Sequence, residues 1–136
     1  MSTAANTLAA RVPTVAGIGT NQTTSSSSYT DLATVGPVVT VTTGTQALVG
    51  IGFFGSDNTA GCAAQMSWAV SGASTIAAGA IGGLLTVTGV NLNSGINSVF
   101  MQTGLTAGSN VFTAKYNAAG GGTASFQNRQ LFVIPL

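Results

Sequence analysis

The stretch that decides the fold is Thr103–Leu136, TGLTAGSNVFTAKYNAAGGGTASFQNRQLFVIPL. It predicts two β-strands joined by a glycine-rich loop. In the first strand Phe112, Ala114 and Tyr116 fall on one face, because side chains alternate between the faces of a strand. The second strand ends in residues 131–136, which are apolar on both faces and must be covered on both sides. The domain's own core would cover one side, and we expect further copies of the chain to cover the other.

Runs with period-two alternation also precede this stretch, and each stops at a cluster of Gly, Pro, Ser or Asn. Gly50 and Gly52 lie within one such run and indicate that a large side chain or another backbone comes close. Together with the closing pair, the runs make about eight strands, the number in a jelly roll. We therefore predict an all-β fold, a jelly-roll β-sandwich of antiparallel strands over residues 29–136. The earlier predicted strands cover residues 29–35, 38–43, 46–54, 64–70 and 96–103, with another around Leu85 and Val87.

Residues 1–28 predict an extended N-terminal arm ahead of the sandwich. The arm ends in a polar segment, residues 20–28, that has no hydrophobic periodicity. No basic region precedes its apolar part, so it does not read as a signal peptide and we expect synthesis in a cytoplasm. An uncharged arm of this kind becomes ordered when it lies along a neighbour in an assembly.

Only 4% of the 136 residues are charged, three Lys or Arg and two Asp, with no His and no Glu. An ordinary soluble protein has about 25%. Near-zero net charge promotes association. No run supplies the roughly 20 apolar residues of a membrane-spanning helix, so we expect no membrane partner. The composition favours a protein that sits among other copies of itself.

The same composition leaves little for catalysis. A carboxylate pair would require Asp31 and Asp57 to converge, and Lys115 is the only amine for a serine–lysine mechanism. We expect neither, and assign no catalytic residue and no enzymatic activity. One Cys without His predicts no metal site. Gly120–Gly122 lacks the GK[ST] of a phosphate loop, so we expect no cofactor, and a hairpin loop that tolerates substitution. Three dispersed cations predict no nucleic-acid binding.

Three segments carry a resemblance, in this order: YTDLATVGP (29–37), MSWAVSGAS (66–74) and NRQLFVIPL (128–136). With them, residues 25–136 resemble small virion structural proteins of tailed phages of actinobacteria. The resemblance implies a jelly roll of the trimer-forming kind, similar to those of head decoration proteins and of phage fibre tips. The low charge and the glycine-rich stretch 79–83 depart from the family.

We therefore expect a virion structural protein, namely a homotrimeric capsid decoration (cement) protein on the outer surface of the capsid. Its partners would be itself and the major capsid protein of the same phage. The alternative is a minor tail or fibre-tip protein that binds a host glycan or protein through loops 55–63 and 117–123. We expect Val133→Asp or Leu131→Asp to break both assembly and fold. The candidate trimer-interface residues are Leu131, Val133, Leu136, Phe54 and Phe112, and those of a capsid-binding arm are Val12, Pro13, Val15 and Ile18.

Overall fold

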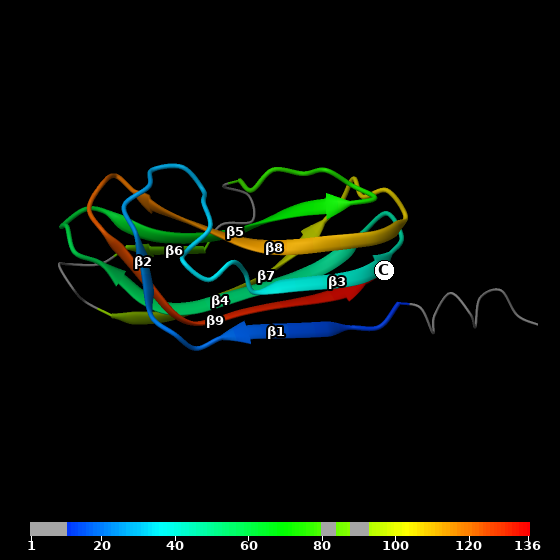
Figure 1. Cartoon of the computed structure of the whole chain (residues 1–136), viewed down its shortest axis with the longest axis horizontal. Coiled ribbons are helices and arrows are strands. Elements are labelled where there is room, and N and C mark those ends of the chain that lie inside the picture. The colour runs from blue at the N-terminus through cyan, green and yellow to red at the C-terminus, as the bar shows by residue number, and fades with distance from the viewer. Residues whose placement is uncertain (1–10, 80–83, 88–92) are drawn as a thin grey trace, which may run out of the picture.

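A computed structural model describes residues 11–79, 84–87 and 93–136. Within these ranges the chain forms nine β-strands arranged in two layers (Figure 1). No helix of the described residues has the length and hydropathy needed to cross a membrane. The strands are β1 (Thr14–Ile18), β2 (Gln22–Thr24), β3 (Val38–Thr43), β4 (Ala47–Asp57), β5 (Ala63–Gly72), β6 (Leu84–Val87), β7 (Ser94–Gln102), β8 (Gly108–Ala119) and β9 (Ala124–Pro135).

All strand pairs are antiparallel. One sheet, here called sheet A, has the order β1-β9-β4-β7, and β2 pairs with β9 beyond the end of β1. The other, sheet B, has the order β3-β8-β5-β6. Sheet A thus has five strands and sheet B four, and two antiparallel sheets with this interleaved order are the arrangement of a jelly roll. The predicted all-β jelly-roll sandwich is therefore confirmed.

The core lies between the two sheets and follows the predicted alternation. Phe112, Ala114 and Tyr116 of β8 are all fully buried, as are Leu131 and Val133 of β9. Aromatic rings connect the layers, since the ring centroid of Phe126 in sheet A lies 4.8 Å from that of Tyr116 in sheet B. Within sheet A, the centroid of Phe126 also lies 4.9 Å from that of Phe53. Tilted ring pairs at this separation stabilise a core beyond the area that they bury.

A β-bulge interrupts β9 in the middle. The pairing with β4 passes from Gly52–Gln130 to Phe54–Gln127, so β9 holds one residue more than β4 there. Asn128 has a φ of 48°, the left-handed conformation that many bulges require. The added residue shifts the alternation of side chains along β9. Before the bulge the even-numbered residues, such as Phe126, point into the core, and after it the odd-numbered residues, such as Leu131, do so.

The N-terminal region differs from the sequence prediction. Residues 29–35 are not a strand and make only one bridge, between Thr30 and Tyr116. Instead, β1 and β2 lie within the predicted arm and pair with β9. The predicted boundary between residues 28 and 29 is therefore not a boundary of the sheet. Residues 1–10 of the arm lie outside the described residues.

Candidate functional site

The outer side of sheet A carries a continuous apolar surface. Val133 and Val49 pair and both point into the core, so the next pair along, Phe132 and Gly50, points outward. The register aligns this row across β1, β9, β4 and β7, and it aligns the neighbouring row, which includes Ile134, across β9, β4 and β7. We call the outward apolar side chains of these two rows the apolar face: Val15 of β1, Phe132 and Ile134 of β9, Leu48 of β4, and Val99 and Met101 of β7.

These side chains remain accessible in the folded chain. Val15 is 68% exposed, Val99 54% and Met101 48%. Leu48, Phe132 and Ile134 are half-buried. None of the six carries a charge or a polar group. Scattered exposed apolar residues need no explanation, but a contiguous group marks an interaction site.

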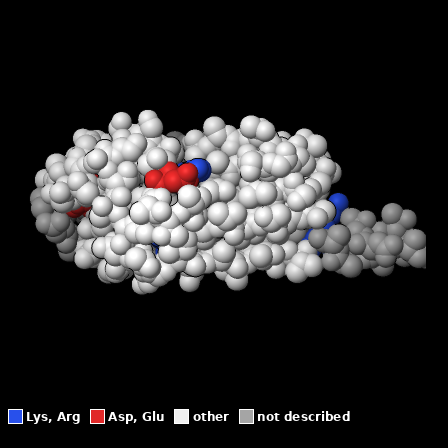
Figure 2. All heavy atoms as spheres, viewed as in Figure 1, with Lys and Arg blue, Asp and Glu red and all other residues white. Residues whose placement is uncertain are grey.

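The outer side of sheet B is different. Thr40 and Thr42 of β3 are exposed, and Thr113 and Lys115 of β8 are half-buried. Val38, at the start of β3, is 42% exposed. Charge is also sparse on the side of the molecule that Figure 2 shows. One small cluster of adjacent basic and acidic atoms lies near the middle of an otherwise nearly uncharged surface. The two outer sides are thus unequal, and the apolar one belongs to sheet A.

Gly50 is part of what makes the apolar face. A Cβ added there would collide with the ring of Phe132, which occupies the space above the glycine. This confirms the prediction that a glycine in this strand marks the close approach of a large side chain. The ring therefore lies low on the sheet, and Val15 and Val99 on either side remain accessible.

The sequence prediction of the trimer interface needs correction. Leu131, Val133 and Phe112 are 0% exposed and fill the core between the sheets. They are not available to another chain, because the strand pleat turns them inward. Leu136 is 43% exposed, and Phe54 is half-buried beside Gly95. The interface prediction missed Phe132 and Ile134, although the same alternation places them on the face opposite Leu131 and Val133.

The predicted arm residues also lie at this side of the molecule. Val12 and Pro13 are exposed just before β1, and Val15 points outward from it. Ile18 is half-buried and pairs with Arg129. Val15 is therefore a member of the apolar face, and Ile18 is part of the sheet.

The two loops predicted to contact a host converge at one end of the sandwich. The backbone N–H of Asn58 donates to the carbonyl of Thr123 (3.1 Å), and the N–H of Thr123 donates to the side-chain oxygen of Asn58 (2.8 Å). Asp57 is fully buried, and its carboxylate accepts a hydrogen bond from the N–H of Thr59 (2.9 Å). The glycine loop is therefore fixed against the end of β4.

This packing overturns the expectation that the glycine loop tolerates substitution, and we expect Gly122→Ala to destabilise the fold. Gly122 has a φ of 74°, and an added Cβ would collide with the Asp57 carboxylate and lie 2.6 Å from the Thr59 hydroxyl. The matched control is Gly121→Ala, where φ is 115° and nothing lies within 4 Å of the added atom. We expect about 1–2 kcal/mol from backbone strain alone at Gly121, and at least about 1 kcal/mol more at Gly122. Urea unfolding measures both, and equal losses would show that the contact does not matter.

Two of the five charged side chains form an ion pair. Lys115 pairs with Asp31 at 2.6 Å on the surface. Among the described residues no group of three or more His, Cys, Asp or Glu is placed to hold a metal ion. Cys62 is a buried free thiol. Within the described part of the chain, the apolar face is therefore the candidate functional site.

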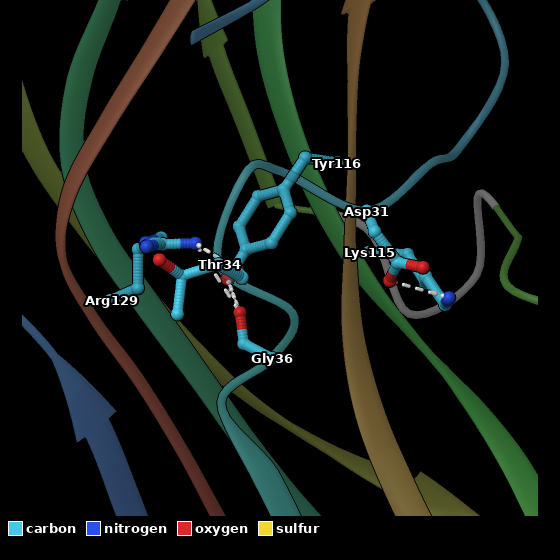
Figure 3. Close-up of polar contacts among 6 residues, drawn as sticks. All are labelled: Asp31, Thr34, Gly36, Lys115, Tyr116 and Arg129. Carbon is cyan, nitrogen blue, oxygen red and sulfur yellow. Dashed lines mark hydrogen bonds and ion pairs between the residues drawn. The ribbon is translucent and has the colours of Figure 1, made fainter. Parts of the chain in front are cut away.

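The sequence pattern did not predict the burial of Arg129. It indicates only that Arg129 is one of three dispersed cations, whereas the side chain is 0% exposed. Its guanidinium lies 5.3 Å from the ring centroid of Tyr116 and donates to the carbonyl of Gly36 (3.3 Å) (Figure 3). The Tyr116 hydroxyl donates to the same carbonyl (2.9 Å). Burial raises the pKa of Tyr116 above its ordinary value of 10.0, and the nearby guanidinium offsets part of this rise.

Comparisons with known proteins identify the fold. No protein-family model matches the sequence, and no curated protein matches it. A structure of the Eiger TNF from S. frugiperda superposes with a TM-score of 0.60 at 12% identity, over 92% of each chain. A structure of the Gx strain of infectious bursal disease virus superposes with a TM-score of 0.51 at 9% identity, over 90% of this chain and 33% of the viral chain. At these identities the similarity establishes that the sandwich has the same general fold as both.

Proposed function

We propose that this chain is a non-enzymatic virion structural protein, a homotrimeric decoration protein that binds the outer surface of a phage capsid. The observation that carries the proposal is the apolar face. The sandwich already has a complete core of its own, yet six uncharged, apolar side chains remain on the outer side of sheet A. Burying such a surface is favourable, by about 25 cal/mol per Å².

Other copies of this chain are the partner that best matches this face. A face without charge offers no electrostatic selectivity, and an equally uncharged copy presents no repulsion or unpaired ion to it. Exposed Val, Met and half-buried Phe side chains resemble the apolar centre of oligomer interfaces. The trimeric state comes from the resemblance to trimer-forming phage jelly rolls, and closed symmetry would cover the face in every copy.

Two further points support a place on a virion. The fold is shared with a structure of infectious bursal disease virus, over most of this chain. Val12 and Pro13 are exposed just before β1, beside the apolar face, and we expect the arm to contact the major capsid protein. Many identical weak contacts on one particle would add up through multivalency.

A minor tail or fibre-tip protein is the second candidate. The observation that favours it is the convergence of loops 55–63 and 117–123, which hydrogen bonds between Asn58 and Thr123 join at one end of the sandwich. Copy number separates the two roles. Quantitative mass spectrometry of purified particles should find hundreds of copies of a decoration protein, whereas a handful would favour the tail-tip role.

Deleting residues 2–10 is expected to abolish attachment to capsids and to leave the oligomeric state unchanged. A longer deletion to residue 25 would remove β1 and β2 and so damage sheet A. The measurement is co-sedimentation of the purified variant with capsids that lack this protein. A variant in which residues 2–10 are replaced by a Gly/Ser segment of equal length controls for chain length. Binding of the deletion variant at full occupancy would contradict the role of the arm.

A further inference from the structure

Residues 22–37, here called the strap, close one side of the sandwich. The strap begins as β2 on the edge of β9 and then crosses to sheet B (Figure 1). There it takes the edge of β8 beyond the end of β3. The N–H groups of Ala114, Tyr116 and Ala118 donate to the carbonyls of Pro37 (3.0 Å), Thr30 (2.9 Å) and Ser26 (2.7 Å), respectively. The strap therefore pairs with β9 of sheet A and with β8 of sheet B on the same side of the sandwich.

Arg129 holds the strap from inside. Its Nη2 donates to the side-chain oxygen of Gln22 (2.9 Å), and its Nη1 faces the carbonyls of Thr34 (3.5 Å) and Gly36 (3.3 Å). Gln22 in turn accepts from the N–H of Thr34 (2.9 Å) and donates to the Thr34 hydroxyl (2.7 Å). Among the residues that the structure describes, every hydrogen-bond acceptor of this guanidinium therefore belongs to the strap.

The energetics make strap docking and guanidinium burial a single event. Arginine does not lose its proton in proteins, so its charge persists when it is buried. No carboxylate bonds to Arg129 within the described residues, and three neutral oxygens with one aromatic ring take that role. A buried charge that loses its partners is costly. Detachment of the strap would remove all three oxygens at once, so the strap leaves only when water reaches the guanidinium.

The position of Arg129 connects the strap to the apolar face. The bulge at Asn128 turns Arg129 inward, at the point on β9 where pairing with β1 ends and pairing with β2 begins. Ile18, the last residue of β1, pairs with Arg129 itself. Three residues earlier, Val15 is the outermost member of the apolar face. Only residues 19–21 separate β1 from β2.

We propose that Arg129 is a latch that holds residues 14–37 on the sandwich and thereby completes the apolar face. When the latch is closed, β1 is fixed and Val15 lies in line with Phe132. When the strap detaches, β1 loses its anchor on the C-terminal side and this edge of the face loosens. The effect on association rests on the proposed self-association through the apolar face, whereas the effect on the strap does not.

Hydrogen exchange of the full chain, read by mass spectrometry, tests the latch in Arg129→Met. We expect amides of residues 14–37 to exchange at least about tenfold faster, while those in the middle of β4 and β5 keep their protection. The matched control is Lys115→Met. It also removes one positive charge next to the strap, but from the exposed pair with Asp31, and it should leave exchange nearly unchanged. Figure 3 shows that the two cations contact the strap at separate places.

Gln22→Ala provides a second reading in case Arg129→Met does not fold. It removes one acceptor from the edge of the cluster, and we expect the same local increase in exchange with a smaller amplitude. A uniform increase across all strands in Gln22→Ala, or an equal response to Lys115→Met and Arg129→Met, would overturn the latch. Sedimentation of the same samples distinguishes the two proposals. If the variants show faster exchange in the strap alone while the wild-type chain sediments as a monomer, the latch stands and self-association is refuted.

Discussion

Val133→Asp is expected to prevent the chain from folding. Val133 is 0% exposed and pairs with Val49 in the centre of sheet A, where the described structure offers no cation to a new carboxylate. An unpaired buried charge costs at least about 4 kcal/mol. A domain of this size has about 5–15 kcal/mol of stability in total. Circular dichroism during urea titration should show loss of the sheet signal at neutral pH without denaturant or at very low concentrations of it.

The matched control is Val38→Asp, the same substitution at an exposed position at the start of β3. It carries the lower strand propensity of aspartate, a cost of about 1 kcal/mol, but no burial of charge. A folded Val133→Asp variant with the stability of Val38→Asp would contradict the assignment of Val133 to the core.

Val99→Asp is expected to leave the fold intact and to abolish self-association. Val99 is 54% exposed on β7, opposite Gly50, in the same row as Phe132 and Val15. The solvated carboxylate costs the single chain about 1 kcal/mol, through strand propensity. In an assembled face the carboxylate would be buried without a partner, at about 3 kcal/mol or more, which weakens association about a hundredfold. Sedimentation velocity over a dilution series measures the dissociation constant.

Val38→Asp again serves as the control, because it adds the same charge to the opposite sheet. It should associate like the unaltered chain. Equal weakening by both substitutions would indicate that net charge, rather than the apolar face, governs assembly. Association of Val99→Asp at wild-type strength would remove Val99 from the interface.

The alternation of apolar residues predicted the core well. Phe112, Ala114 and Tyr116 face inward as expected, because pleating fixes the direction of each side chain once a strand is recognised. The prediction that the domain's own core covers one side of residues 131–136 is also confirmed, whereas cover of the other side by further copies stays a prediction. The error lay in the face, since Leu131 and Val133 supply the core and Phe132 and Ile134 point outward. Alternation within one strand separates its two faces, but it does not show which of them packs against the opposite sheet.

The local sequence pattern could not predict which distant strands pair. Residues 14–18 form a strand because β9 has a free edge there, and their sequence, TVAGI, is only a weak strand signal by itself. Residues 29–35 alternate like a strand, yet only Thr30 pairs, because the strap must turn from one sheet to the other. Likewise, the burial of Arg129 depends on a bulge at Asn128. Asn tolerates the left-handed conformation, but one Asn within a strand pattern is too weak a signal to predict a bulge.

The central claim is that copies of this chain meet through the outer side of sheet A. Native mass spectrometry of the unaltered chain beside Val99→Asp tests this most directly. We expect a species of three times the 13.3 kDa of one chain for the unaltered protein, and the single-chain mass for Val99→Asp at the same concentration. A single-chain mass for the unaltered protein, or a trimer that persists in Val99→Asp, would contradict it.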